Sequence, residues 1–221
     1  MEFFYEKTVP DFFQTKLCEA DKEHAHDPQK AADIAWSAFE FMKKTESFSI
    51  PHIGYMQNQT DISERMRAIL VDWLIEVHLK FKLLPETLFL TVNLIDRYLA
   101  RVMVPRTQLQ LVGVTAMLIA SKYEEIYAPT AKEFAYITDR AVSKKDILMM
   151  EYQMITTLDF NINCHSAFRF LERHLLLNKA DEKLTCLSRY LIELPLIEYR
   201  MLRYKPSIIA ASALFLSNKI L

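Results

Sequence analysis

Residues 109–127 read LQLVGVTAMLIASKYEEIY, and this stretch decides the fold class. Through residue 120 it is apolar on nearly every side of a helix, which is typical of a helix buried at the centre of a bundle. Gln110, Gly113 and Thr115 interrupt the run, so it falls short of the roughly 18 continuous apolar residues that a membrane span requires. A glycine inside a helix costs about 1 kcal/mol relative to alanine, so Gly113 predicts a close crossing with another helix.

Amphipathic helices are predicted on both sides of this central helix. Capping-box spacings at Asp61, Thr130 and Ser143 predict three helix starts, and Pro85 predicts a fourth. With the central helix, these make five helices between residues 61 and 160, joined by loops of a few residues. The pattern therefore predicts one compact helical domain.

After residue 165 the pattern begins again. Apolar residues recur over 168–171 and 184–194, and Pro206 then opens an apolar helix much as Pro105 precedes the central one. A second five-helix unit begins here, and the chain stops after its third helix. We expect each of these three helices to leave an apolar face uncovered.

The residues ahead of the first helical domain differ from it in composition. The first 60 residues carry 10 acidic against 6 basic side chains, and they start with aromatic residues. A helix is predicted from Pro28 to about Lys44, followed by an extended linker. The sequence is therefore divided into an N-terminal extension (1–27), an N-terminal helix and linker (28–60), a first helical domain (61–162) and a partial second domain (163–221).

Composition narrows the classes of function. The 221 residues are 51% hydrophobic and carry 27 Lys and Arg against 28 Asp and Glu, a formal net charge of −1. This balance argues against a nucleic-acid binder held mainly by phosphate contacts. Average usage of about 7% would give roughly fifteen glycines, but the chain has 2. Since β-hairpins and phosphate-binding loops need glycine, an all-α globular protein is expected.

The three cysteines, Cys18, Cys164 and Cys186, have no CxxC spacing, and their odd number cannot make a closed disulfide framework. We interpret them as small buried hydrophobic side chains in a reducing compartment. The N-terminus shows no secretory signal. We therefore expect the protein in the nucleus and the cytoplasm, without contact with a membrane.

No catalytic or metal-binding pattern occurs among the six histidines. The motifs HExxH, GxGxxG, GxSxG and the P-loop are all absent. His24 and His26 lie in a polar tail, where such a pair is more often without a metal. Cys164 and His165 are neighbours in the chain, so their side chains point apart and do not form a nucleophile–base pair. We expect no catalytic residue, no metal and no cofactor, and hence no enzyme.

Two groups of residues indicate binding instead. On the helix after Asp61, an apolar stripe with a tryptophan and a nearby acid is typical of a groove for a short peptide with hydrophobic and basic residues. From spacing alone, the same stripe is more often a pattern of core packing. Lys122, at the charged end of the central helix, and Glu151, on a later helix, are expected to pair or to bind the backbone of a partner; a solvated helix end is the alternative.

Four segments of the sequence closely resemble the cyclin box of mitotic cyclins, the B-type more than the A-type. They are MRAILVDWLIEV (66–77), KLLPETLFLTVNLIDRYL (82–99), the stretch 109–127 and YITD (136–139). The resemblance extends over roughly residues 39–221. It implies tandem cyclin folds, the second one truncated, after an N-terminal helix.

The same resemblance implies a regulatory subunit that binds and activates a cyclin-dependent serine/threonine kinase at G2/M, as a heterodimer. The residues that match the family's kinase-binding positions are Phe41, Ile119, Lys122, Tyr123, Glu125, Ile126, Glu151, Ile155, Phe160 and Ile162. Those that match its docking patch for RxL-type substrates or inhibitors are Met66, Ile69, Leu70, Trp73, Glu76, Arg106 and Gln110.

Two other functions stay open on the sequence. One is a cyclin-fold transcription factor that binds promoter DNA, against which the near-zero charge and the intact MRAIL and KYEEIY segments both count. The other is a helical-repeat scaffold without a kinase partner.

Overall fold

The computed structural model describes residues 19–221, and every regular element within them is a helix, as the sequence predicts. The aromatic start of the chain and Cys18 lie outside the described residues. The α-helices are α1 (Glu19–Glu23), α2 (Ala35–Thr45), α3 (Glu64–Phe81), α4 (Pro85–Leu99), α5 (Leu109–Glu124), α6 (Ala131–Ile137), α7 (Lys144–Thr157), α8 (Ala167–Leu177), α9 (Glu182–Ile197) and α10 (Pro206–Ile220).

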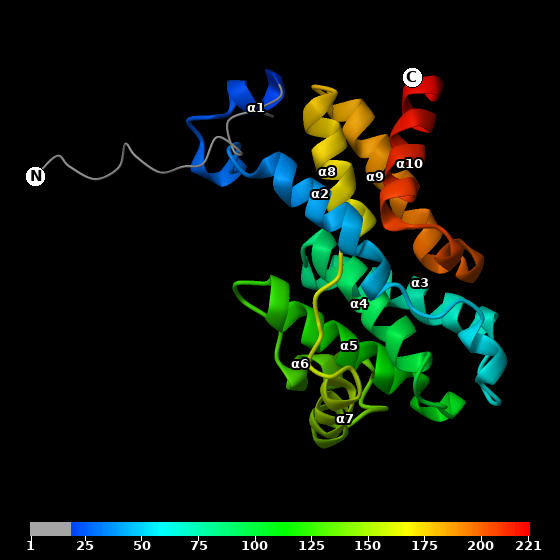
Figure 1. Ribbon diagram of the computed structural model, residues 1–221. Helices are drawn as coiled ribbons and strands as arrows, with labels where there is room; N and C mark the ends of the chain where they lie inside the picture. The colour runs from blue at the N-terminus through cyan, green and yellow to red at the C-terminus, as the bar shows by residue number, and fades with distance from the viewer. Residues whose placement is uncertain (1–18) are drawn as a thin grey trace, which may run out of the picture.

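The helices form two groups, which Figure 1 shows in the lower and upper halves of the molecule. In the first fold, α3 to α7, helix α5 packs against α3, α4, α6 and α7. In the second fold, α8 to α10, each helix packs against the other two. Helix α2 lies beside α8, where the Phe39 ring meets the Phe170 ring edge to face at 5.7 Å. The N-terminal helix thus belongs spatially with the second fold.

Helix α5 is the centre of the first fold, as its sequence predicts. Every residue from Val112 to Ser121 is buried. A Cβ atom on Gly113 would lie 2.7 Å from Leu70 Cδ1 of α3, closer than real Cβ contacts. The predicted close helix crossing at Gly113 is therefore confirmed, and it brings α3 against α5.

Two of the three predicted capping boxes are present. The Thr130 hydroxyl accepts from the Glu133 amide while Glu133 accepts from the Thr130 amide, and Ser143 and Asp146 do the same. The third prediction was wrong: α3 is capped by Ser63, whose hydroxyl accepts from the Met66 amide. Asp61 instead accepts from the Arg106 amide at 2.8 Å, because its side chain faces the turn that precedes α5.

The segment between α2 and α3 is only partly extended. It contains two 3₁₀ turns, Glu46–Ser49 and Tyr55–Asn58, and Tyr55 is buried. The predicted helix from Pro28 is interrupted as well: a short 3₁₀ turn, Pro28–Lys30, precedes α2. The linker side chains of Tyr55 and Glu46 are therefore buried in the interior of the protein.

The predicted open apolar faces occur on two of the three helices of the second fold. Large apolar side chains are exposed on α9 and α10, among them Tyr190, Ile208 and Phe215. The prediction was wrong for most of α8, whose Phe170 and Leu171 are fully buried. The reason is that α2 and α10 both pack on α8.

A buried ion pair joins the two folds to the linker. The Arg67 guanidinium of α3 bonds the Asp96 carboxylate of α4 twice, at 2.6 Å each, and both side chains are 1% exposed. The Tyr55 hydroxyl donates to the same carboxylate at 2.7 Å, and Arg67 also donates to the Leu196 carbonyl of α9 at 2.9 Å. Burial alone lowers the pKa of Arg67, but the Asp96 carboxylate outweighs it and raises the pKa.

The two described cysteines are free thiols, and the interpretation of buried side chains holds in part for Cys164 and not for Cys186. Cys164 is half-buried between the folds, and the loss of hydration raises the pKa of its thiol to about 12. Cys186 is exposed on α9, which the sequence did not predict. Within residues 19–221, no helix combines the length and apolarity needed to cross a membrane.

Candidate partner-binding surfaces

The Lys122 ammonium and the Glu151 carboxylate meet at the surface of the first fold. Lys122 Nζ lies 2.6 Å from Glu151 Oε1, with side-chain exposures of 50% and 15%. Lys122 comes from the last turn of α5, where the central helix leaves the core, and Glu151 comes from the middle of α7. The pair leaves ammonium protons and carboxylate lone pairs for a partner's backbone.

Apolar side chains follow this pair in the chain, on the same helices or just beyond them. Tyr123, Ile126 and Phe160 are 52%, 90% and 72% exposed, and Ile155 and Ile162 are half-buried. Together with Lys122 and Glu151 these five residues are called the α5–α7 surface below. Exposed apolar side chains that adjoin a polar pair are typical of a protein–protein contact.

The backbone after α7 turns Phe160 outward. Asp159 and Phe160 both have left-handed φ angles, 55° and 56°, which are uncommon for residues other than glycine. The Phe160 amide donates to the Ile155 carbonyl at 3.0 Å and so closes the end of α7. Arg97 of α4 then donates to the Asn161 carbonyl at 2.6 Å and fixes the following segment. The backbone that carries the exposed ring is therefore held in place.

Two residues expected at this surface have other positions. Ile119 is 3% exposed and belongs to the core beneath the surface. The Glu125 carboxylate accepts from the Leu84 amide at 2.7 Å and from the Thr87 hydroxyl at 2.6 Å, so it caps the start of α4. Both residues therefore stabilise the fold that carries the α5–α7 surface.

Phe41 comes from a different part of the molecule. It lies on α2, is 61% exposed, and meets the His165 ring edge to face at 6.0 Å. Because α2 has no buried residue of its own, Phe41 depends on few contacts for its position.

The apolar stripe of α3 forms a groove as well as part of the core. A hollow of about 270 Å³ is lined by Met66, Ile69, Leu70, Trp73, Arg106, Leu109 and Gln110. Leu70 is 6% exposed and packs into the core, whereas Ile69 is 61% exposed at the edge of the hollow. Different side chains of the same helix therefore line a hollow and fill part of the core. These seven residues are called the α3 groove.

Charge at the α3 groove is less concentrated than the sequence suggested. Glu76 is exposed on α3 but does not line the groove. Arg106, at the rim, lies 3.9 Å from the carboxylate of Asp61. Leu109 also lines the groove and was not predicted as a site residue, although it lies three residues after Arg106.

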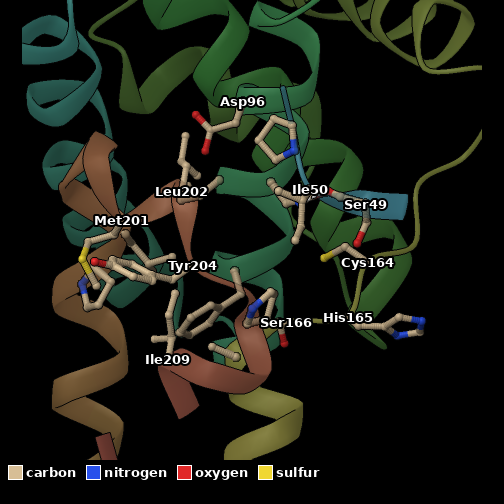
Figure 2. A pocket seen from close by; sticks show the side chains of 18 of the residues that line it. Ser49, Ile50, Asp96, Cys164, His165, Ser166, Met201, Leu202, Tyr204 and Ile209 are labelled. Carbon is tan, nitrogen blue, oxygen red and sulfur yellow. Dashed lines mark hydrogen bonds between the residues drawn. The ribbon is translucent and has the colours of Figure 1, made fainter. Parts of the chain in front are cut away.

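A smaller hollow, of about 100 Å³, lies between the two folds and the linker (Figure 2). Figure 2 shows the sulfur of Cys164 directed toward Ile50, while the ring of His165 points away from the middle of the hollow. The predicted divergence of these two neighbouring side chains is confirmed. No group of three or more His, Cys, Asp or Glu residues that could hold a metal ion occurs in residues 19–221.

The ion pair of Arg67 and Asp96 was also missed by the sequence analysis. Each residue occupies one position of an otherwise apolar helical repeat, which is a weak signal for burial. Charged side chains are almost never fully buried unless they are paired, and a single sequence does not show which residues pair.

Comparison with known proteins gives matches over both folds. The family model described as the cyclin N-terminal domain matches residues 37–163, and that described as the cyclin C-terminal domain matches residues 165–221. A solved structure of a viral cyclin from herpesvirus saimiri has a similar fold, with a TM-score of 0.74, 22% identity and 80% coverage of each chain.

Curated relatives are similar at higher identity. Cyclin-B2-2 of Arabidopsis thaliana is 47% identical over 90% of this chain, G2/mitotic-specific cyclin-1 of Medicago sativa subsp. varia 50% over 88%, and G2/mitotic-specific cyclin-B of Dictyostelium discoideum 44% over 89%. The chain spans 46%, 46% and 45% of the lengths of these relatives.

Proposed function

The chain belongs to the cyclin family, and from this premise we propose that it is the regulatory subunit of a cyclin-dependent serine/threonine kinase. In this proposal the two proteins form a heterodimer, and the chain activates the kinase at G2/M without contributing a catalytic group. The names of its relatives, B-type and G2/mitotic-specific cyclins, support this role. Its place of action is proposed to be the nucleus and the cytoplasm.

The observation that carries the proposal is the exposed ion pair of Lys122 and Glu151, at 2.6 Å, among exposed apolar side chains. A helix of the kinase would place backbone groups against the ammonium and the carboxylate, and its apolar face against Ile126, Ile155 and Phe160. Charge-assisted hydrogen bonds of this kind are stronger than neutral ones and fix the orientation of the bound helix. Because the pair forms within the free chain, little ordering is needed on binding.

Activation then follows from differential affinity. A surface that fits the helix in the active kinase conformation binds that conformation more tightly than the inactive one. Binding therefore shifts the kinase population toward the active state. A shift from 1:99 to 99:1 requires about 10⁴-fold tighter binding to the active state.

The charge-swapped double variant Lys122→Glu with Glu151→Lys tests the proposal. It preserves the internal ion pair and the net charge but reverses the charges that face the partner. We expect the wild-type chain to bind and stimulate a purified mitotic cyclin-dependent kinase, and the double variant to lose both activities. The matched control swaps the exposed pair of Glu19 and Lys22, at 2.8 Å, and should bind as the wild type does. Undiminished kinase binding by the Lys122/Glu151 variant would disprove this interface.

We further propose that the α3 groove docks RxL-type substrates or inhibitors. Ile69 and Trp73 would bind the apolar residue of the motif. Glu76, exposed on the same helix, would face its arginine. Trp73→Ala should weaken binding of a labelled RxL peptide by at least about tenfold in fluorescence polarisation, while kinase activation persists. Leu79→Ala, at an exposed position of the same helix outside the groove, is the control. Equal loss of both activities would indicate a folding defect.

The alternative of a promoter-binding transcription factor has no support among the relatives, which carry the names of cyclins. Titration of promoter DNA in increasing salt distinguishes it, because binding through phosphate contacts weakens steeply as salt rises.

A further inference from the structure

Helix α2 contacts the second fold through the aromatic side chain of Phe39. None of its residues is buried. Near its middle, the Phe39 ring meets Phe170 and His174 of α8, both edge to face at 5.7 Å. Because no residue of α2 is buried, the orientation of the helix depends on each of these ring contacts.

The last turn of α2 is fixed by His165, in the segment between the two folds. The Thr45 hydroxyl donates to the Phe41 carbonyl at 2.6 Å and lies 2.8 Å from His165 Nε2. Because the only hydroxyl proton goes to Phe41, the hydroxyl oxygen accepts from Nε2. Burial lowers the pKa of His165, with Glu46 acting in the opposite direction, which favours the uncharged ring. The contact with the Thr45 hydroxyl then places the ring proton on Nε2. The same ring packs against Phe41.

The residue after α2 is bound to the second fold as well. Glu46 is 1% exposed. Its two carboxylate oxygens accept from Ser207, one from the amide at 3.0 Å and the other from the hydroxyl at 2.8 Å. Ser207 lies in the first turn of α10, so the end of α2 is joined to the start of α10.

We propose that His165 and Glu46 are positioning residues: through them the segment between the two folds and the start of α10 set the orientation of α2 and present Phe41 to the partner kinase. The inference rests on the proposed kinase-binding function. Apart from Phe41, the proposed kinase-binding residues lie on the first fold and in the segment that follows α7. His165 and Glu46 would thus strengthen kinase binding without contacting the kinase themselves.

A double-mutant cycle on the 221-residue chain tests whether His165 acts through Phe41. The affinity for a purified mitotic cyclin-dependent kinase is measured for wild type, Phe41→Ala, His165→Ala and the double variant. We expect Phe41→Ala to weaken binding about tenfold, His165→Ala about threefold to fivefold, and the double variant no more than Phe41→Ala alone. His52→Ala, at an exposed position of the linker, is the matched control and should leave the affinity unchanged.

Conservative variants separate positioning from loss of folding. Thr45→Val removes the hydroxyl and should reproduce the effect of His165→Ala, whereas Thr45→Ser retains it and should bind like wild type. Glu46→Gln should also weaken binding, and again only when Phe41 is present. Thermal unfolding of each variant shows whether the chain is intact under the conditions of the affinity measurement.

The outcomes distinguish this inference from the function on which it rests. If the wild-type chain binds no cyclin-dependent kinase, both are wrong. If it binds, and His165→Ala weakens binding equally with and without the Phe41 ring, the proposed function stands and the positioning role is wrong. Phe41→Ala binding with wild-type affinity would overturn the positioning role in the same way.

Discussion

Helices α5 and α10 are alike in sequence and differ in surroundings. Pro105 precedes the turn before α5 and Pro206 is the first residue of α10, and each helix is apolar over most of its length. In α5 every residue from Val112 to Ser121 is buried, because four other helices surround it. In α10 the buried residues are Ala210, Ala213, Leu214 and Ser217, while Ile208, Phe215 and Leu216 are exposed. The first fold therefore has a complete core, and the second fold has an incomplete one.

The second fold compensates with contacts from outside its own helices. Arg67 of α3 binds a carbonyl of α9, Glu46 binds the start of α10, and Phe39 of α2 packs on α8. An ion pair adds to these, because Asp21 of α1 accepts from Arg173 of α8 at 2.6 Å. The second fold therefore depends on the N-terminal segment and on α3 for part of its packing.

Asp96→Ala should have the largest effect on this arrangement. It leaves the Arg67 guanidinium buried without its counter-ion and the Tyr55 hydroxyl without its acceptor. Breaking a buried ion pair in this way costs about 3–5 kcal/mol in the free energy of unfolding. Urea denaturation followed by circular dichroism measures the loss. Asp159→Asn, in an ion pair whose carboxylate is 83% exposed, should change stability by less than about 1 kcal/mol. Equal losses in the two variants would contradict the special role of the buried pair.

Gly113→Ala should destabilise the first fold despite the higher helix propensity of alanine. The new methyl group would lie 2.7 Å from Leu70 Cδ1, so α3 and α5 would have to separate or Leu70 change rotamer. Overpacking of this kind costs about 1–3 kcal/mol. In a Leu70→Ala background the contact is absent, and the same substitution should become neutral or stabilising. Denaturation of both pairs of proteins measures the difference, and an equal cost in both backgrounds would show that the crossing is not tight.

These residues also show how much of the fold can be predicted from the sequence. The burial of α5, the crossing at Gly113 and two capping boxes follow from helical periodicity and local hydrogen bonding, which act within a few residues. The capping box at Asp61 was wrong because a tertiary contact with Arg106 takes its carboxylate. The cover on α8 was missed because α2 is distant in sequence.

Some features of the candidate site were likewise predicted from the sequence, and others are shown only by the structure. The family resemblance identifies Lys122 and Glu151 as site residues. Only the structure shows that their side chains pair at 2.6 Å. The family resemblance does not predict that Glu125 caps α4 or that Ile119 is buried. A position that matches a family motif can contact the partner or can stabilise the chain's own fold. Glu46 has no motif at all: its role depends on α10, more than 150 residues later in the sequence.

Glu46→Ala should destabilise the second fold locally. It removes two hydrogen bonds from the first turn of α10, and the loss of a helix cap or of bonds to a charged group costs about 1–2 kcal/mol. We expect amide hydrogen exchange to accelerate in α10 while exchange in α5 stays as in wild type. Glu198→Ala, an exposed cap of the short turn Tyr199–Arg203, is a control for general effects of losing a carboxylate. Equal acceleration in α5 and α10 would mean that the two folds open as one unit.

Phe215→Ser should have the smallest effect, since the ring is 63% exposed on α10 and its described contact is with the Lys219 ammonium, 4.9 Å from the ring centre. An exposed cation–π contact contributes about 0.5–1 kcal/mol, which bounds the loss. The adjacent Leu214 is 7% exposed, so Leu214→Ala should cost at least about 2 kcal/mol by the same denaturation measurement. If Phe215→Ser costs as much as Leu214→Ala, the open face of α10 must be covered in solution. The second fold would then be as fully packed as the first, and the contrast between α5 and α10 would not hold in solution.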